Sequence, residues 1–358
     1  MRILIAGDWH SELHEEAVYN AFKKLGHEVS RFAWHDYFKP SNRIDALNKK
    51  IQNKFIAGPI VWKINRDLIR TAKEFVPDMI FVYRGTHITA QTLKKIKQEL
   101  PVTTLVGYNN DDPFAKGHPY SLWRHFFKAV PEYDLMLAYR HHNLGDFLRI
   151  GAKRVELLRS WYFPERNYPV TLSAQDKIKY ECDVVFIGHF EADERKQYLE
   201  ELVRKGFNLK IFGPEWNEKI RFSPELKSLL PVNSVLGEDY NKALCGAKIA
   251  LCFLSKLNRD TYTRRCFEIP ATGTLMLSEY TDDLASLYKE GEEADFFRSQ
   301  DELIEKLKLY LEDESLRQSV AAKGYRRVIE DGHNVISRME QVLKSVALLK
   351  LNEGNVCG

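Results

Sequence analysis

The chain has 358 residues, of which 44% are hydrophobic and 29% are charged, and its formal net charge is +3. This length predicts two domains, because a single hydrophobic core seldom keeps growing beyond about 250 to 300 residues. The net charge is too small to indicate a nucleic-acid-binding surface, so we expect no nucleic-acid partner.

The apolar run at residues 3–7 is too short for a signal peptide, and no stretch reaches the roughly 18 apolar residues of a membrane span. We therefore expect a cytoplasmic protein without a transmembrane segment, for which peripheral membrane contact stays possible. The cysteines follow no zinc-binding spacing, so we expect reduced thiols and no bound metal. They are Cys182, Cys245, Cys252, Cys266 and Cys357.

The first half of the chain has the pattern of a parallel α/β sheet. It opens with a strand, a helix at residues 13–25 and a second strand, and Gly26 fits the end of that helix. Continuous apolar runs then predict further buried strands. The predicted strands are residues 3–7, 28–34, 78–83, 102–108, 133–139 and 154–158.

The same pattern begins again after residue 180, which predicts a second Rossmann-like domain. Residues 160–180 contain Pro164 and Pro169 and read as the linker. We predict domains at residues 1–165 and 166–332 and a final amphipathic helix at 333–358. The strands expected in the second domain are residues 183–188, 208–213, 247–254 and 274–277, and its helices include 195–205, 301–312 and 314–330.

Dinucleotide and P-loop signatures are absent. Neither Gly7 nor Gly188, which end the first strand of each half, begins a G-x-G-x-x-G pattern, and no Walker motif is present. The two halves are therefore not expected to bind NAD or to hydrolyse nucleotides as a P-loop protein does.

Residues 263–278 place arginines, one carboxylate and a glycine directly before an apolar strand. Glu268 is predicted on a short helix that ends at Gly273, where a buried carboxylate without hydrogen-bond donors would be costly. The two hydroxyls of a ribose offer matching donors. The alternative is that Glu268 forms an ion pair between the domains with Arg264 or Arg265.

The pattern Thr263-x-Arg265-x-Phe267-Glu268-Ile269-Pro270-Ala271-x-Gly273, followed by an apolar strand, resembles the C-terminal domain of glycosyltransferases of the GT-B fold. Within that fold it is most similar to the family named for the spore-maturation protein CgeB. The resemblance covers most of residues 180–345. It implies an acceptor-binding and a donor-binding Rossmann-like domain with a cleft between them, and a C-terminal helix that crosses back to the first domain.

The resemblance also implies donor contacts around Glu268. Arg265 lies one helical turn earlier, and its guanidinium suits a diphosphate, unless it only extends into solvent. Tyr262 and Thr263 could contact the sugar and a phosphate, or could simply pack. Asp260 stands eight positions before Glu268, where related retaining transferases have an acid near the sugar ring, and is therefore a catalytic candidate.

Three residues near the start of the second domain are further candidates for donor binding. Gly188 and Gly213 each end an apolar strand, at the sheet edge where α/β folds bind ligands. Their missing side chains would let a donor approach the backbone, or would serve only a tight turn. Arg195 matches an arginine that is common in the CgeB-like pattern, and its alternative role is a surface charge.

Polar loops follow several predicted strands of the first half. The segment at residues 108–113 resembles the aromatic, acid-acid-proline segment of CgeB-like proteins, and its Asp111 or Asp112 could accept the acceptor's proton or merely cap a turn. His10 is a further catalytic candidate, although a lone loop histidine is more often incidental. The candidate acceptor contacts are Asp8, His87 and Arg140.

The sequence therefore predicts a glycosyltransferase that moves a sugar from a nucleotide-diphosphate sugar to a hydroxyl of a glycan, a lipid-linked or a protein acceptor. We expect retention of anomeric configuration by family analogy and no cofactor beyond the donor substrate. Two alternatives remain open. One is a nucleotide-sugar epimerase or phosphorylase on the same fold, and the other is a non-catalytic module that binds sugar nucleotides or glycans.

Overall fold

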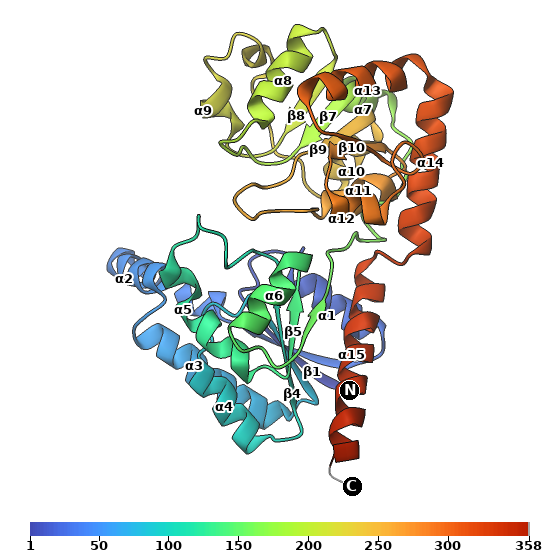
Figure 1. The fold of residues 1–358 in the computed structure, drawn as a ribbon. Helices are drawn as coiled ribbons and strands as arrows, with labels where there is room; N and C mark the ends of the chain where they lie inside the picture. The colour runs from blue at the N-terminus through green and yellow to red at the C-terminus, as the bar shows by residue number, and fades with distance from the viewer. Residues whose placement is uncertain (357–358) are drawn as a thin grey trace. The chain divides into compact units, whose positions relative to one another are not determined.

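The computed structural model describes residues 1–356 and divides the chain into two compact units (Figure 1). Unit 1 combines Met1–Ser160 with the C-terminal helix α15 (Val335–Val356), and unit 2 is Trp161–Asn334. The sequence had suggested divisions after residues 165 and 332, and the structure has them after residues 160 and 334. Cys357 lies outside the described residues, and the other four cysteines are free thiols.

Unit 1 is built on a six-stranded parallel sheet in the order β2-β1-β3-β4-β5-β6. All six strands expected in the first half of the chain are present. They are β1 (Arg2–Gly7), β2 (Glu28–Ala33), β3 (Met79–Tyr83), β4 (Thr104–Asn109), β5 (Leu135–Ala138) and β6 (Val155–Leu157). Every residue of β3 and β4 is buried, as expected for strands covered on both faces.

Helices cover both faces of this sheet, as Figure 1 shows. Ile64 and Leu68 of α3 and Leu93 of α4 share one core with Leu4 and Ile80 of the sheet. The helices are α1 (Glu15–Lys24), α2 (Arg43–Phe55), α3 (Pro59–Phe75), α4 (Ala90–Glu99), α5 (Tyr120–Ala129) and α6 (His141–Arg149), with 3-10 turns η1 (His35–Phe38) and η2 (Val130–Glu132).

Helix α15 packs against α1 and belongs to unit 1. Its apolar stripe is buried, with Met339 and Val342 fully inaccessible to solvent. Polar bonds hold the same helix: Gln341 Nε2 donates to the Leu157 carbonyl over 2.8 Å, and Arg338 Nε donates to the Ser160 carbonyl over 3.2 Å. No helix in the part of the chain that the structure describes is long and apolar enough to cross a membrane.

Unit 2 is built on a five-stranded parallel sheet in the order β11-β10-β9-β7-β8. Its strands are β7 (Cys182–Ile187), β8 (Leu209–Phe212), β9 (Ala247–Cys252), β10 (Leu275–Glu279) and β11 (Asp295–Phe297). Its helices are α7 (Ala174–Tyr180), α8 (Arg195–Arg204), α9 (Trp216–Ile220), α10 (Glu238–Cys245), α11 (Arg265–Ala271), α12 (Asp282–Leu287), α13 (Gln300–Glu312) and α14 (Glu314–Glu330), with a 3-10 turn η3 (Leu226–Leu229). The expectation of two Rossmann-like α/β domains is therefore confirmed.

Candidate functional site

Each sheet has one point where its strand order reverses. In unit 2 the chain runs from β7 outward to β8 and returns to β9 on the other side of β7. In unit 1 the corresponding point lies between β1 and β3. Ligands of open α/β sheets bind at the carboxyl ends of the strands next to such a point. Two candidate sites lie at these two edges.

In unit 2, Arg265 lies over the carboxyl end of β7. A Cβ atom added to Gly188 would come within 3.4 Å of Arg265 Nη1, so the guanidinium lies close against this glycine. Arg265 is half-buried, its Nε is buried without a hydrogen-bond partner, and no carboxylate in residues 1–356 lies within ion-pairing distance of it. A half-buried cation without a counter-ion at a strand end is suited to an anionic ligand.

Glu268 lies on the same short helix, α11, and is 7% exposed. Its Oε2 accepts a hydrogen bond from the hydroxyl of Tyr240 over 2.6 Å, and its Oε1 has no partner in residues 1–356. No arginine or lysine of the described chain lies within ion-pairing distance of Glu268, so the structure has no direct ion pair with Arg264 or Arg265. The Glu268 carboxylate still acts on Arg265 at longer range, as one of the charges that raise the pKa of its guanidinium. The helix ends as expected, because Gly273 after it has a left-handed backbone with φ of +74°.

Tyr240, on α10, is the partner that the sequence analysis did not identify. Burial, and then the neighbouring Glu268 carboxylate, raise the pKa of Tyr240 well above its ordinary value of 10.0. The phenol therefore stays protonated and donates to Glu268. This bond fixes one carboxylate oxygen and leaves the other for a ligand.

Arg195 does not lie at the surface, which excludes the alternative of a surface charge. It is 2% exposed, and its guanidinium donates to Asp193 over 2.7 Å and lies 3.2 Å from a carboxylate oxygen of Glu191. It also donates to the carbonyls of His189 and Leu254, which follow β7 and β9. Arg195 thus joins the two loops that flank the reversal point, and its N–H groups are already used within the protein.

Gly213 is required by the packing of the backbone. Its φ is +141°, and a Cβ atom there would approach the carbonyl oxygen of Gly188 to 2.1 Å. The same carbonyl accepts a 2.8 Å hydrogen bond from the indole of Trp216, which is buried. The tight-turn alternative therefore explains Gly213 fully, whereas Gly188 itself lies beside Arg265.

The remaining donor candidates occupy the segment before α11. Tyr262 is fully buried, and its ring packs edge-on against Phe267 at 5.6 Å. The carbonyl of Thr263 accepts a bond from the Cys266 amide over 3.0 Å, and Asp260 donates its amide to the Ser255 carbonyl over 2.9 Å. Tyr262 therefore packs in the interior, while Thr263 and Asp260 lie half-buried beside the helix.

In unit 1, a cavity of about 420 Å³ lies at the reversal point between β1 and β3. Asp8 and Arg84, which directly follow these two strands, line it together with His87. Lys50 and Lys54 of α2 contribute two more cations to its wall. Arg84 holds a left-handed backbone with φ of +66°, a conformation that costs energy in residues other than glycine and gathers at binding sites.

The structure brings Asp8 and His10 together. His10 Nδ1 lies 2.9 Å from Asp8 Oδ2, and both side chains are partly accessible to solvent. The buried Glu15 accepts a 2.9 Å bond from the Asp8 amide and fixes the loop. A carboxylate that orients one imidazole nitrogen leaves the other nitrogen able to accept a proton. Asp8 and His10 therefore form the accessible acid–base pair of this edge.

The two acids of the β4 loop differ in their surroundings. Asp111 is half-buried and forms a 2.7 Å ion pair with Arg84. Asp112 is inaccessible and accepts bonds from the Phe114 amide over 3.1 Å and from Asn143 over 3.0 Å. Asp112 thus caps the turn around Pro113, which is the alternative that the sequence left open.

His87 and Arg140 are both buried. Burial lowers the pKa of His87 to about 3, so its ring is neutral near pH 7. Its Nε2 lies 3.0 Å from Asn53 Oδ1, and the cavity wall therefore contains a neutral imidazole. Arg140 donates to the carbonyl of Asn110 over 3.1 Å and so supports the loop that carries Asp111.

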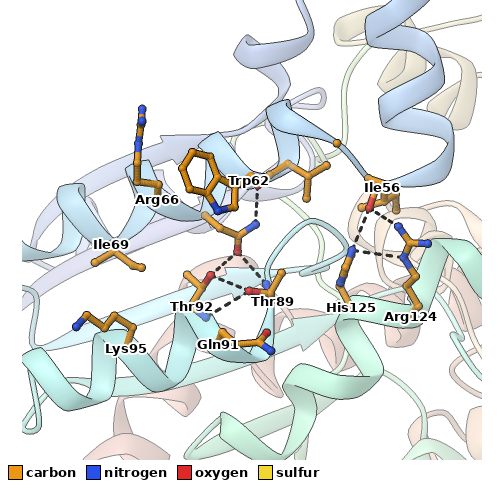
Figure 2. A pocket seen from close by; sticks show the side chains of 14 residues that line it. Ile56, Trp62, Arg66, Ile69, Thr89, Gln91, Thr92, Lys95, Arg124 and His125 are labelled. Atoms are coloured by element: carbon orange, nitrogen blue, oxygen red, sulfur yellow. Dashed lines mark hydrogen bonds between the residues drawn. The ribbon is translucent and has the colours of Figure 1, made fainter.

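A second cavity of unit 1, of about 750 Å³, is shown in Figure 2. Its polar side chains mainly bind one another or the backbone: Arg124 and His125 both bond to the Ile56 carbonyl, over 2.7 and 2.9 Å. Thr92 Oγ1 donates to Asn65 Oδ1 over 2.6 Å. Trp62 lies at its wall and is 69% exposed. This cavity therefore has a mainly apolar wall, and the polar side chains named here are already bonded within the protein.

Sequence reasoning missed Tyr240, Arg84, Lys50 and Lys54 as site residues. Arg84 had a recognisable signal, because it follows a buried strand just as Asp8 does. Tyr240, Lys50 and Lys54 lie on helices far from the strand ends in the sequence, and only the fold brings them to the edges. No group of three or more His, Cys, Asp or Glu side chains within residues 1–356 is arranged to hold a metal ion.

Residues 195–344, which include Arg265 and Glu268, match a family model described as glycosyl transferase-like. No curated protein sequence matches the chain. The whole chain is similar in structure to the Anabaena protein HepE in complex with UDP and glucose, with 12% identity, 97% of this chain and 99% of that chain covered, and a TM-score of 0.67.

Two further solved structures share this architecture. Sucrose-phosphate synthase from Thermosynechococcus elongatus has 10% identity and a TM-score of 0.70, with 98% of this chain and all of that chain covered. A UDP-N-acetylglucosamine 2-epimerase, so described provisionally, from Listeria monocytogenes has 9% identity and a TM-score of 0.60, over 96% and 95% of the two chains. These likenesses show that the chain has the GT-B fold of two Rossmann-like domains.

Proposed function

We propose that this protein is a glycosyltransferase that transfers a sugar from a nucleotide-diphosphate sugar to a hydroxyl group of an acceptor. One observation carries the proposal: Arg265, without a counter-ion, lies against Gly188 at the reversal point of unit 2, beside a Glu268 carboxylate with one unoccupied oxygen. This pair matches a diphosphate joined to a ribose. The glycosyl transferase-like match includes both residues.

On the donor side, Glu268 Oε1 accepts hydrogen bonds from the ribose hydroxyls, while Arg265 binds the diphosphate. The bond between the anomeric carbon and the diphosphate oxygen breaks, and negative charge grows on the departing phosphate. A guanidinium already in place stabilises that charge more in the transition state than in the bound substrate. We propose that Arg265 serves in place of a metal ion.

On the acceptor side, the hydroxyl oxygen forms the new bond to the anomeric carbon, and its proton passes to His10. Asp8 holds His10 Nδ1, which leaves Nε2 as the accepting nitrogen. Asp111 is the alternative base. We also propose that Asp260 is the acid that the resemblance implies near the sugar ring. Retention of anomeric configuration and membership of the CgeB-type family are further parts of this proposal.

A thermal-shift screen with UDP, GDP, dTDP and CMP tests the donor class first. Glu268→Ala is then expected to weaken the selected nucleotide by about 1 to 3 kcal/mol, because the ribose donors lose their acceptor. Glu238→Ala, at an acid on the neighbouring helix α10 that forms only an exposed pair with Lys242, is the matched control. Equal affinities in Glu268→Ala and wild type would refute the ribose contact.

A nucleotide-sugar epimerase is the second candidate, because the Listeria protein described above has the same fold. Incubation of the protein with the selected nucleotide sugar alone, followed by product analysis, separates the two. An isomerised sugar nucleotide identifies an epimerase, whereas a product formed only after an acceptor is added identifies a transferase. Tight donor binding without any turnover would instead support a binding module.

A further inference from the structure

Helix α2 of unit 1 exposes its apolar side chains. Ile44, Leu47, Ile51 and Phe55 are its four large apolar residues, and they are between 49% and 84% exposed. Their spacing of three, four and four residues puts them on one face of the helix. No residue of α2 is buried. A helix on a soluble domain normally turns such a stripe toward the core, and α2 does the opposite.

The polar residues of α2 hold it to the protein instead. Lys49 donates to the Lys39 carbonyl over 2.6 Å, and Gln52 Oε1 accepts from the Ile60 amide over 2.9 Å. Asn53 Oδ1 lies 3.0 Å from the ring of His87. The helix is therefore anchored in this orientation by specific bonds, and its apolar stripe is presented outward by the fold.

A row of basic residues runs beside the stripe. Arg43, Lys50 and Lys54 are spaced by seven and four residues, so they lie along one side of the helix next to Leu47. All three are exposed, and none forms an ion pair with any residue in 1–356. An apolar stripe bordered by unpaired cations is the composition of helices that lie in the plane of a membrane surface.

We propose that unit 1 docks through α2 on a bilayer surface that contains anionic lipids. The four apolar side chains enter the boundary between headgroups and acyl chains, and the row of cations binds the headgroup phosphates. A neutral apolar partner would leave the three cations without counter-charges.

Lys50 and Lys54 also line the cavity that contains Asp8 and Arg84. Docking would therefore bring this cavity next to the headgroup layer, where a hydroxyl acceptor carried by a lipid would be available. This consequence depends on the proposed transfer reaction, whereas docking itself does not. A binding measurement with vesicles and no nucleotide sugar can therefore fail or succeed independently of the proposed enzyme activity.

The test is co-sedimentation of the full chain with vesicles of phosphatidylcholine containing about 30% phosphatidylglycerol, compared with phosphatidylcholine alone. Wild-type protein is expected to bind the anionic vesicles and to be released by salt. Leu47→Glu together with Ile51→Glu should weaken binding by roughly tenfold or more, since two inserted side chains become charged. Lys50→Ala with Lys54→Ala should remove the preference for anionic vesicles.

Phe222→Glu, at an aromatic residue of unit 2 that is 82% exposed, is the matched control and should bind as wild type does. All substituted side chains are exposed, and an unchanged melting temperature confirms folding. Absence of wild-type binding, or equal binding by wild type and the Leu47/Ile51 variant, would overturn the proposal. A concentration-dependent dimer that this variant abolishes, without vesicle binding, would assign the face to a second copy and would overturn it too.

Discussion

The carboxyl edges of the two sheets differ in how their charges are paired. In unit 2, Arg265 has no counter-ion in the described chain, and Glu268 is held by a neutral phenol. In unit 1, Asp111 pairs with Arg84 and Asp8 with His10. Lys50 and Lys54 at the unit 1 cavity also form no ion pair in the described chain, so an unpaired cation alone does not separate the two edges. What differs is that unit 1 has an accessible acid–histidine pair, which can take the proton of a hydroxyl, whereas unit 2 has a carboxylate with one unoccupied oxygen beside its cation. This difference supports our proposal that the donor binds to unit 2 and the acceptor to unit 1.

The largest effect is expected from removal of the accessible base of unit 1. His10→Ala is expected to lower kcat by about 10²- to 10⁴-fold, the usual contribution of a general base. Nucleotide affinity should not change, because the diphosphate is assigned to unit 2. Steady-state kinetics and a nucleotide titration on the same preparation measure both quantities.

Asp111→Asn tests whether Asp111, and not His10, is the base that accepts the proton. If this variant loses transfer while His10→Ala retains it, the proton passes to Asp111 and the Asp8–His10 pair has another role. Asp112→Asn does not distinguish the two, because Asp112 is inaccessible and its loss would disturb the turn around Pro113.

The second test removes Arg265, the cation that lies against Gly188 in unit 2. Arg265→Ala is expected to lower kcat by about 10²- to 10³-fold, as for the loss of one preorganised donor to a developing negative charge. Nucleotide affinity should fall as well. Arg264→Ala is the matched control, because Arg264 also has a buried Nε without a hydrogen-bond partner but lies over the ring of Phe163 at 5.8 Å. Equal losses in both variants would show that position 265 has no special role.

The sequence was sufficient to predict the fold because both halves carry a strong signal. Buried parallel strands are continuous apolar runs, and Gly273 marked the end of α11 at the expected position. The position of Glu268 before a buried strand was equally informative, because burial of a carboxylate restricts its partners.

The partners of the site residues could not be predicted in the same way. Tyr240 precedes Glu268 by 28 residues, and only the fold brings the two side chains within hydrogen-bonding distance. Arg195 and Arg265 are both arginines close to a helix start, yet one is bound to Asp193 and Glu191 and the other is unpaired. Residue type and spacing do not encode that difference, since it depends on which loops meet at the strand ends.

The third prediction concerns the charge of the unit 1 cavity. Its cations are Lys50, Lys54 and Arg84, and His87 is neutral because burial lowers its pKa to about 3 from an ordinary 6.5. Below pH 6.5 the unfolded chain binds a proton at His87 that the folded chain does not. The neutral ring therefore contributes its full share to the free energy of unfolding above pH 6.5, and this contribution is lost as the pH falls toward 3. At pH 5 the loss is about 2 kcal/mol.

His87→Gln removes this titration. Urea unfolding at pH 7 and pH 5 should show a loss of unfolding free energy that is smaller in the variant by about 2 kcal/mol. Because Gln can still bond to Asn53, the difference between the two pH values measures only the effect of protonating His87 on the free energy of unfolding. Identical losses in variant and wild type would mean that His87 is protonated in the folded protein and adds to the positive charge of the cavity.

The smallest effect is expected from Tyr240→Phe. This variant tests the role of the neutral phenol that donates to Glu268 at the edge of unit 2. The phenol fixes Glu268 Oε2 over 2.6 Å without neutralising the carboxylate, so both the charge and one oxygen remain for the ribose. Its loss should weaken nucleotide binding by about 1 kcal/mol, the net value of one hydrogen bond. In the Glu268→Ala background, Tyr240→Phe should cause no further loss, since the two side chains act through one contact. Calorimetric titration of the two single variants and the double variant measures this coupling, and additive losses would mean that Tyr240 contacts the nucleotide independently of Glu268.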